Sequence, residues 1–422
     1  MFLIYRIATI VFYPFFVLII CIRKIANKES GRSCTQKLFA NSSKLPHVKK
    51  KIVWFHGASI GEIRSVIPII NHLIHTNVDI KILLTSTTLS SGQIIGTEFS
   101  KNENVYHQYL PLDVPYLVNK FLDHWDPSIA IFIDSEIWPN FILNIKEKDI
   151  PLILINGRIT KKTFKKWKLF NNFTKIIFSS FDLCFASSED SYKNLKTLGV
   201  KNIKYFGNLK FITSLKKNST LEETSKNYFD KCKVWCAAST HKSEEIFCME
   251  VHKKLKKTYD NTLTIIIPRH IHRIEEIFHQ CIKLNLKTQI IKHGDIINEG
   301  IEVILINSFG VLDRYYSYCK SVFIGKSLKK ELILVGGQNP LEAASAGCKI
   351  YHGPYVYNFQ EIYQFLNKIN ITKQVNNTEE LTKHIIQDFK TVKNINTNNV
   401  EKINAFGKDI LNKTMKELIK LI

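Results

Sequence analysis

The stretch Val53-Trp-Phe-His56-Gly-Ala-Ser-Ile-Gly61-Glu62, continued by Ile63–Ile70, decides the fold of this chain. The apolar run before His56 is rich in β-branched and aromatic residues, which is typical of a buried strand. Small residues then break the run, and beyond Glu62 apolar residues recur at the spacing of a helix. A strand, a tight turn and a helix in this order predict the opening of a doubly wound α/β unit.

Glu62 lies where such a unit binds its ligand, because ligands of these folds sit outside the carboxyl ends of the strands. One interpretation is an acid in the first turn that complements the helix dipole. The other is a general base that takes a proton from an incoming hydroxyl. Gly57 and Gly61 favour the base, since glycine lets a ligand approach the backbone closely. The spacing alone does not decide between them.

Bulk composition narrows the class of protein. A length of 422 residues predicts two domains, and 45% hydrophobic with 23% charged residues is typical of a globular protein. The formal net charge of +22 favours anionic partners, namely phosphates, nucleic acid or an acidic membrane surface. The nine cysteines contain no Cys-x-x-Cys pair, so we expect small buried side chains in a reducing compartment and no zinc site.

The N-terminus is one apolar run from Phe2 to Ile22, broken only by Arg6 and Pro14. Its length suits a membrane span, and a cleaved signal peptide would need a small-residue cleavage site that does not follow. Arg23 and Lys24 come next, and this positive charge predicts that the rest of the chain is cytoplasmic. We expect an uncleaved single-pass anchor; the alternative is a monotopic helix lying in the interface.

Alternating strand and helix patterns fill the rest of the chain and predict two mainly parallel sheets. Strands are expected at 52–55, 80–85, 105–110, 129–133, 152–155, 183–186 and 203–205, then at 234–237, 263–267, 289–291, 303–306, 322–324 and 350–351. A polar hinge is expected from Asn208 to Glu223. The predicted parts are an anchor with a basic connection (1–35), a first Rossmann-like domain (36–212) and a second one (213–422), whose final helix packs back.

Two Rossmann-like halves facing a cleft describe glycosyltransferases, dehydrogenases and periplasmic binding proteins alike. The first unit has no Gly-x-Gly-x-x-Gly, and the chain has no Walker lysine loop, which disfavours dinucleotide and NTPase functions.

Polar residues follow several predicted strands and form the candidate site. Asp134 and Glu136 follow the fourth predicted strand, close to Trp138. One interpretation is that these acids take part in the reaction. The other is an N-cap carboxylate, with Trp138 as a residue that packs between domains. Arg158 follows the next strand and is expected to project into the same cleft. Lys210 lies at the hinge, where its ammonium group can bind a phosphate as a point charge.

In the second half, Arg269 follows a strand, and its guanidinium matches phosphate geometry. The glycine-rich segment Gly336–Gly347 is the strongest nucleotide candidate. Pro340 starts a helix there, whose free amides can hold a phosphate, and Glu342 can accept hydrogen bonds from a ribose.

The segment from Thr160 to Phe170 combines an aromatic repeat with a dense run of lysines. Phe164, Trp167 and Phe170 are spaced three apart, and the lysines are Lys161, Lys162, Lys165, Lys166 and Lys168. On a helix this pattern suits anionic lipid headgroups. The alternative is a surface helix whose aromatic stripe faces the core.

Together these motifs resemble the 3-deoxy-D-manno-octulosonic acid (Kdo) transferases over nearly the whole chain. The resemblance rests on His56–Glu62, Glu136–Asn140, Asn156–Arg158, Gly207–Lys210, Ala238–His241, Ile267–His270, Gly336–Glu342 and Gly353–Phe359. It implies a GT-B glycosyltransferase that moves Kdo from CMP-Kdo to a phosphorylated lipid A precursor with inversion. It also implies attachment to the inner membrane, catalytic domains on the cytoplasmic face, no cofactor besides the donor, and no metal.

The resemblance also implies roles for individual residues. Glu62 would be the base, while Glu136 and Lys210 would stabilise the transition state. The CMP moiety would be held by Pro268, Arg269, Phe309, Gly310, Val311, Asn339, Pro340, Leu341 and Glu342. Two departures stand out: Phe309-Gly-Val311 replaces the usual Met-Gly-Glu, and Gly325-Lys326 replaces a Gly-Gly pair.

Two alternatives stay open. One is a UDP-sugar-dependent lipid glycosyltransferase of the same fold. The other is a membrane-tethered basic protein that binds nucleic acid, which the lack of any helix-turn-helix, zinc or aromatic-sheet signature disfavours.

Overall fold

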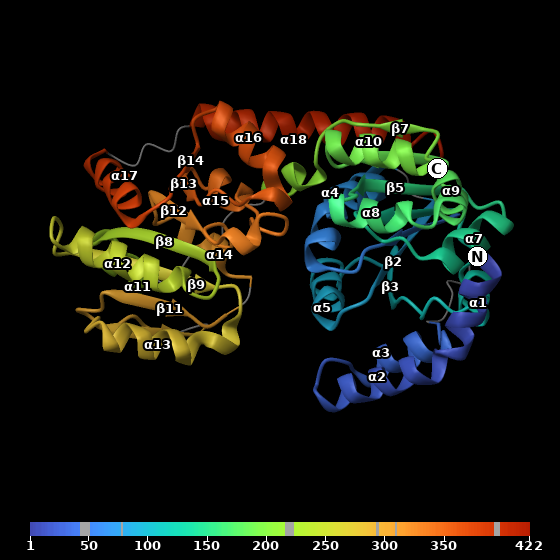
Figure 1. The fold of residues 1–422 in the computed structure, drawn as a ribbon, viewed down its shortest axis with the longest axis horizontal. Helices are drawn as coiled ribbons and strands as arrows, with labels where there is room; N and C mark the ends of the chain where they lie inside the picture. The colour runs from blue at the N-terminus through green and yellow to red at the C-terminus, as the bar shows by residue number, and fades with distance from the viewer. Residues whose placement is uncertain (43–50, 77–78, 216–222, 293–294, 309, 392–396) are drawn as a thin grey trace. The chain divides into compact units, whose positions relative to one another are not determined.

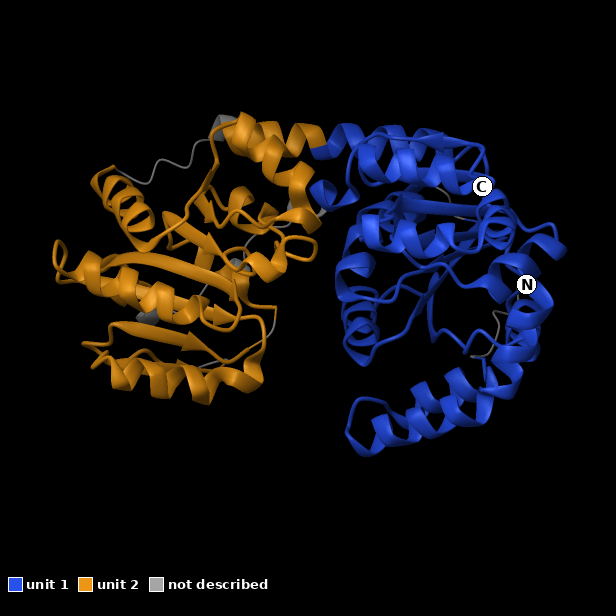
Figure 2. Cartoon of the chain, viewed as in Figure 1, with its two compact units in different colours: residues 1–213, 407–422 blue, residues 214–406 orange. Residues whose placement is uncertain are grey.

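The computed structural model describes residues 1–422 except 43–50, 77–78, 216–222, 293–294, 309 and 392–396. The chain divides into two compact units, Met1–Thr213 with Gly407–Ile422, and Ser214–Phe406 (Figure 2). Each unit is built on a seven-stranded parallel sheet covered by helices (Figure 1).

The first sheet has the strand order β3-β2-β1-β4-β5-β6-β7. Its strands are β1 (Lys51–His56), β2 (Ile80–Ser86), β3 (Val105–Tyr109), β4 (Ile129–Ile133), β5 (Leu152–Gly157), β6 (Leu183–Ala186) and β7 (Ile203–Lys204). The order reverses between β1 and β4, where doubly wound sheets bind ligands. Trp54 on β1 lies within 4.9 to 5.7 Å of the rings of Phe121, Phe132 and Phe141, centroid to centroid, and these rings fill the core on that face.

The helices of the first unit are α1 (Phe2–Val11), α2 (Tyr13–Ile25), α3 (Gly31–Phe39), α4 (Ile60–Thr76), α5 (Leu89–Glu98), α6 (Pro115–Trp125), α7 (Pro139–Glu147), α8 (Lys161–Lys168), α9 (Asn171–Ser179) and α10 (Glu189–Leu198). Three of these helices precede β1, and the others lie between successive strands, with α8 and α9 together between β5 and β6.

The second sheet has the order β10-β11-β9-β8-β12-β13-β14 and reverses between β8 and β12. Its strands are β8 (Lys233–Thr240), β9 (Thr262–Pro268), β10 (Thr288–Ile291), β11 (Val303–Ile306), β12 (Ser321–Ile324), β13 (Lys349–His352) and β14 (Thr372–Gln374). Its helices are α11 (Glu223–Asp230), α12 (Glu244–Lys256), α13 (Ile274–Lys283), α14 (Leu312–Tyr316), α15 (Leu341–Ser345), α16 (Gln360–Lys368) and α17 (Thr378–Lys390), with short 3-10 turns at Ile271–Arg273, Lys330–Leu332 and Tyr357–Phe359.

Every predicted strand is present in these sheets, and the parallel arrangement is confirmed. Among the strands of the described residues, β14 alone was not predicted, because two of its three residues are exposed at the sheet edge and it has no apolar run. In the predicted hinge, Leu209–Leu215 form a 3-10 helix, and residues 216–222 lie outside the described part of the chain.

The last helix, α18 (Thr397–Leu418), reaches the first unit through its C-terminal half. There Lys204 pairs with Glu417 at 2.7 Å, and Lys51 donates to the carbonyl of Ile422 at 3.0 Å. A Cβ at Gly407 would approach the carbonyl oxygen of Phe211 to 2.6 Å, so the close approach requires glycine there.

The expected single anchor helix is not supported. The apolar run forms two helices, α1 and α2, bent by 50° at Phe12. In the described part of the chain no single helix is long and apolar enough to cross a membrane, although this bent pair passes the test together by length and composition.

In the second unit, the buried carboxylate of Glu244 joins the loops that follow β8 and β12. It accepts hydrogen bonds from the backbone N–H groups of His241, Lys326, Ser327 and Leu328, at 2.6 to 3.2 Å. A Cβ at Gly325 would come within 2.7 Å of the Glu244 carboxylate, so glycine allows the two loops to close around this side chain.

Replacing Glu244 by Gln should therefore destabilise the second unit. One of the two acceptor oxygens becomes an NH₂ group, which leaves about two buried N–H groups unsatisfied at a cost of about 2–5 kcal/mol. Chemical denaturation measures this loss. Glu250→Gln, an exposed position on the same helix, is the matched control and should change stability by less than about 0.5 kcal/mol. Equal stabilities of the two variants would contradict the role of Glu244.

Candidate active site

The loops at the carboxyl ends of β1 and β4 bring Glu62 and Glu136 together in the first unit. The two strands are neighbours in register, with His56 opposite Phe132. Gly57 closes the turn after β1 tightly, because a Cβ there would lie 3.1 to 3.3 Å from Ile133 and from the side chains of the next helix. The predicted meeting of these loops at the sheet edge is thus present in the structure.

Glu62 forms a reciprocal cap with its own turn. Its Oε2 accepts from the backbone N–H of Ala58 at 2.6 Å and of Ser59 at 3.3 Å, and the Ser59 hydroxyl donates to Oε1 at 2.8 Å. The backbone N–H of Glu62 donates to Ser59 Oγ at 3.3 Å, which completes a capping box. Glu62 thus has a structural role in the first turn of α4, beside which the role of a base stays a prediction. A carboxylate has about four acceptor positions, and Glu62 is half-buried, so Oε1 keeps room for a further donor.

The environment of Glu62 also prepares it to receive a proton. Burial raises the pKa of its carboxyl group, and the negative charges of Glu136 and Asp134 raise it further, against the opposing hydrogen bonds from Ser59 and Ala58. A raised pKa brings a carboxylate nearer the basicity that proton transfer at neutral pH requires.

Glu136 is held ionised by two donors. His56 Nε2 lies 3.1 Å from Glu136 Oε2, and the Trp138 indole donates to the same oxygen at 2.8 Å. Burial opposes ionisation of this carboxyl group, but the hydrogen bonds from His56 and Trp138 outweigh it and lower its pKa. His56 is fully buried, and its Nδ1 is 2.9 Å from the hydroxyl of Thr85 on β2.

Asp134 and Lys210 are further charged residues close to Glu62. Asp134 adopts a left-handed backbone conformation (φ 60°), and its carboxylate lies 3.9 Å from the ammonium of Lys210. Burial raises the pKa of Asp134 although Lys210 and Arg158 oppose it, and burial lowers the pKa of Lys210. The buried Asn156 fixes the segment before Lys210, because its side chain accepts from the backbone N–H of Leu209 at 3.0 Å.

Sequence reasoning found the catalytic candidates but missed how they are supported. In the sequence His56 is only one member of a motif, and nothing distinguishes Thr85 from its neighbours. A histidine that ends an apolar strand is a weak signal by itself, because only the three-dimensional register places it between Thr85 and Glu136.

In the second unit, several residues that could bind the sugar-nucleotide donor lie near the carboxyl end of β8. Arg269 follows β9, is exposed, and donates its backbone N–H to the carbonyl of Thr240 at 3.0 Å. The rings of His241 and His270 are 5.3 Å apart. Burial lowers the pKa of both imidazoles, and the positive charge of Lys326 lowers it further. Among the described residues, the buried hydroxyl of Thr240 has no hydrogen-bond partner.

The other residues predicted to bind the nucleotide differ in how far their side chains are buried. Asn339 and Glu342 are half-buried, whereas the side chains of Pro340, Leu341, Val311 and Pro268 are buried and contribute packing. Helix α15 has only five residues, and its first amide, that of Leu341, already donates to Asn339 Oδ1 at 3.1 Å. Gly310 is exposed with φ 74°, and Phe309 lies outside the described residues.

The basic segment forms α8, capped by the Thr160 hydroxyl, which accepts from the backbone N–H of Thr163 at 3.2 Å. Phe164 and Trp167 pack against the core, as the alternative interpretation expected. Leu169 and Phe170 are 79% and 49% exposed, and the exposed lysines of the segment are Lys161, Lys162, Lys165, Lys166 and Lys168. The aromatic stripe is thus shared between core and surface.

Comparison with known proteins assigns the chain to a family. Residues 32–213 match the family model described as 3-deoxy-D-manno-octulosonic-acid transferase (kdotransferase). The 3-deoxy-D-manno-octulosonic acid transferase of Rickettsia typhi is 30% identical, over 86% of this chain and 76% of that protein. The protein of the same name from Rickettsia bellii is 30% identical, over 87% and 86%.

A solved structure shows the same fold at low identity. It is that of a putative UDP-N-acetylglucosamine 2-epimerase from Listeria monocytogenes, which is 14% identical over 88% of this chain and 96% of that one, with a TM-score of 0.61. At this identity the likeness concerns the two-sheet architecture alone. The family relationship rests on the sequence relatives, and the chain belongs to the 3-deoxy-D-manno-octulosonic acid transferases.

Proposed function

We propose that this protein is an inverting glycosyltransferase that moves Kdo from CMP-Kdo to a phosphorylated lipid A precursor, the tetraacyldisaccharide bisphosphate. The reaction belongs to the synthesis of the lipopolysaccharide core and takes place at the cytoplasmic surface of the inner membrane. The observation that carries the proposal is the pairing of two unlike carboxylates at the switch point of the first sheet. Glu62 has a raised pKa and Glu136 a lowered one.

The difference between the two carboxylates assigns their roles. Glu62 Oε1 takes the proton from a sugar hydroxyl of the acceptor. The oxygen of this hydroxyl then forms a bond to the anomeric carbon of Kdo. The bond between this carbon and the phosphate oxygen of CMP breaks at the same time, and its electron pair leaves with CMP. One displacement of this kind inverts the anomeric centre.

Glu136 is a poorer base than Glu62, because the hydrogen bonds from His56 and Trp138 occupy its Oε2 and lower its pKa. It instead supplies a fixed negative charge close to Glu62, which stabilises positive charge that develops on the sugar ring in the transition state. Lys210 is the cation of this cluster, and burial makes its charge count for more than it would in water.

The departing CMP needs positive charge, and the second unit provides it. Arg269 is exposed at the end of β9, and the exposed His270 and half-buried Lys326 lie beside it. An arginine matches the paired oxygens of a phosphate, so Arg269 is the residue we assign to the nucleotide phosphate.

The test is product mass spectrometry with the purified protein and a lipid A precursor. With CMP-Kdo we expect an acceptor that has gained a whole number of Kdo units. UDP-sugars supplied in parallel should give no product, and a product from a UDP-sugar would favour the alternative donor class. The nucleic-acid alternative predicts retention of mixed DNA and RNA on a filter at physiological salt.

Glu62→Gln should reduce turnover by ~10²–10⁴-fold and leave CMP affinity nearly unchanged, because the base acts on the acceptor hydroxyl. Steady-state transfer assays and calorimetry measure the two effects. Glu103→Gln, at an exposed position of the same unit, is the control and should behave as wild type. A Glu62→Gln protein that kept more than about a tenth of the turnover would remove Glu62 from this role.

Arg269→Ala should weaken CMP binding by about 1.5–3 kcal/mol, the usual contribution of a hydrogen bond to a charged group. Calorimetry with CMP measures the difference. Lys283→Ala removes an equal charge from an exposed position of the same unit and should leave affinity within about 0.5 kcal/mol. Unchanged affinity in Arg269→Ala would move the nucleotide site elsewhere.

The exposed lysines of α8 should add a salt-sensitive attraction to anionic membranes. Each lysine near an acidic surface contributes about 1 kcal/mol. Changing all five to Gln should weaken binding to anionic vesicles at low salt, and the difference should disappear at about 1 M salt. Sedimentation with vesicles tests this. If the five-fold variant binds as well as wild type at low salt, the lysines are only a solvated helix face.

A further inference from the structure

The two N-terminal helices have an inner face that is bonded to the first unit. On α1, the hydroxyl of Tyr5 donates to Asp113 Oδ2 at 2.8 Å, and Arg6 donates to the side chain of Asn144 on α7 at 2.7 Å. The buried carboxylate of Asp113 also accepts two backbone N–H groups at the start of α7. Helix α1 is therefore part of the wall of this unit, next to α7 (Figure 1).

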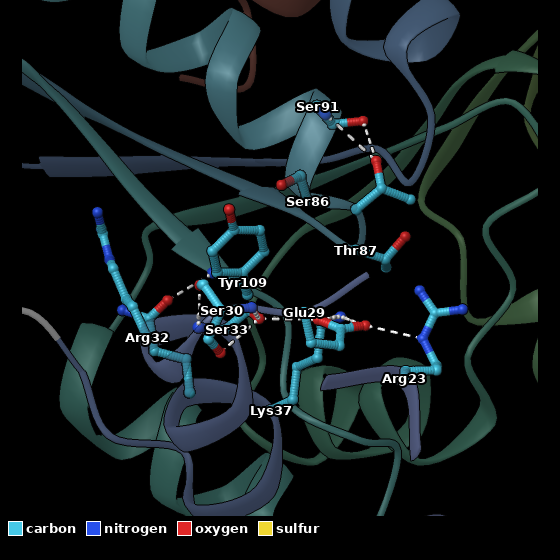
Figure 3. A network of polar contacts seen from close by, with 12 residues as sticks. Arg23, Glu29, Ser30, Arg32, Ser33, Lys37, Ser86, Thr87, Ser91 and Tyr109 are labelled. Atoms are coloured by element: carbon cyan, nitrogen blue, oxygen red, sulfur yellow. Dashed lines mark hydrogen bonds and ion pairs between the residues drawn. The ribbon is translucent and has the colours of Figure 1, made fainter. Parts of the chain in front are cut away.

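The end of α2 is fixed by a buried ionic cluster around Glu29 (Figure 3). Glu29 is 5% exposed, and its carboxylate accepts from the ammonium of Lys37 at 2.6 and 2.7 Å. Arg23 on α2 donates to it at 2.9 Å, and the Ser33 hydroxyl donates at 2.8 Å. The cluster joins the last turn of α2 to α3.

Helix α3 is in turn tied to the sheet. The side chain of Gln36 accepts from the backbone N–H of Tyr109, the last residue of β3, at 2.9 Å, and the carbonyl of Lys37 accepts from Leu112 at 3.0 Å. Moving α2 away from α3 would break the Arg23–Glu29 pair and leave the buried carboxylate of Glu29 with one cation fewer, which is unfavourable.

The opposite face of the same two helices is apolar and exposed. Its residues follow helical spacing along both helices, and each is 37% to 83% exposed: Leu3, Ile4, Ile7, Ile10, Val11, Phe12, Phe15, Leu18, Ile19, Ile22 and Ile25. We call these residues the outer apolar face. Eleven exposed apolar side chains on one face of two consecutive helices mark an interaction site.

Neither helix is long enough to cross a bilayer. At 1.5 Å per residue, α1 spans ~15 Å and α2 ~20 Å, against a hydrocarbon core of ~30 Å. The bend of 50° between them prevents one straight path, and a crossing would pull the polar contacts of Tyr5, Arg6 and Arg23 away from their partners.

We propose that α1 and α2 lie in the plane of the membrane surface, with the outer apolar face in the lipid and the inner face bonded to the first unit. The occupant of this face is a lipid surface, because the apolar residues are followed by exposed cations, Lys24, Lys28 and Arg32, which match anionic headgroups. This docking mode rests on the proposed function for its purpose, since a lipid acceptor has to reach Glu62 from the membrane. Its geometry is independent of that function.

The position of the N-terminus separates lying on the membrane from crossing it. Inverted inner-membrane vesicles expose the cytoplasmic face, so a protease-cleavable tag placed before Met1 should be removed without detergent. The same tag placed after Ile422 is the control and must be cleaved in either arrangement. Protection of the N-terminal tag until detergent is added would overturn the proposal, because the tag would then lie across the bilayer.

The outer apolar face should be required for binding lipid and not for folding. The triple variant Ile7→Glu, Phe15→Glu and Leu18→Glu places three charges on it, and binding to phosphatidylglycerol vesicles should fall at least about tenfold. Its melting temperature should stay close to that of the control triple variant Gln93→Glu, Thr97→Glu and Ser100→Glu. The control changes exposed positions on and just after α5 and should bind vesicles normally.

Two results would contradict the prediction that the outer apolar face binds lipid. Vesicle binding equal to that of the control would show that the outer apolar face does not enter lipid. A wild-type oligomer that the triple variant dissociates, with vesicle binding unchanged, would assign the face to a second copy of the chain. Transfer of Kdo to detergent-dispersed acceptor is measured alongside: if transfer is absent while vesicle binding behaves as expected, the proposed function fails and the docking mode stands.

Discussion

The contact between His56 and Glu136 is the interaction on which the site of the first unit depends. It joins the end of β1 to the loop after β4 across the point where the strand order reverses, at 3.1 Å between Nε2 and Oε2. Burial raises the pKa of Glu62 most, and because His56 and Trp138 keep Glu136 charged, the negative charge of Glu136 raises it further. Burial of Glu62 and the hydrogen bonds to Glu136 together separate the pKa values of the two carboxyl groups, which is a general way to assign acid and base roles.

Each unit has a glutamate at the same topological position, but the two glutamates have different roles. Glu62 and Glu244 each follow the strand before the reversal and each cap the turn at the start of the next helix. Glu244 is buried and its oxygens accept four backbone hydrogen bonds, so it holds two loops together. Glu62 is half-buried and keeps acceptor capacity on Oε1, so it alone remains able to take a proton from a ligand.

Much of this organisation follows from local sequence signals. Apolar runs such as Ile129–Ile133 become buried strands because both faces of a parallel sheet are covered, whereas β14 escapes detection since its polar residues sit at an edge. The apolar N-terminal run has the composition of a membrane span, but composition does not reveal the bend at Phe12 or the partners of Tyr5 and Glu29. The role of His56 depends on strand register, which is a property of the whole sheet.

The pH dependence of kcat/KM for Kdo transfer, in the wild type and in Glu136→Gln, tests most directly the claim that paired carboxylates drive the reaction. The wild-type rate should fall on the acid side with a pKa above the usual 4.5 of a glutamate, because a protonated Glu62 cannot act as a base. Glu136→Gln removes a negative charge that raises the pKa of Glu62, so the acid limb should move to lower pH. The rate itself should be small in this variant, because Glu136 also stabilises the transition state. An acid limb that stays at the same pH in Glu136→Gln would contradict the coupling of the two carboxylates.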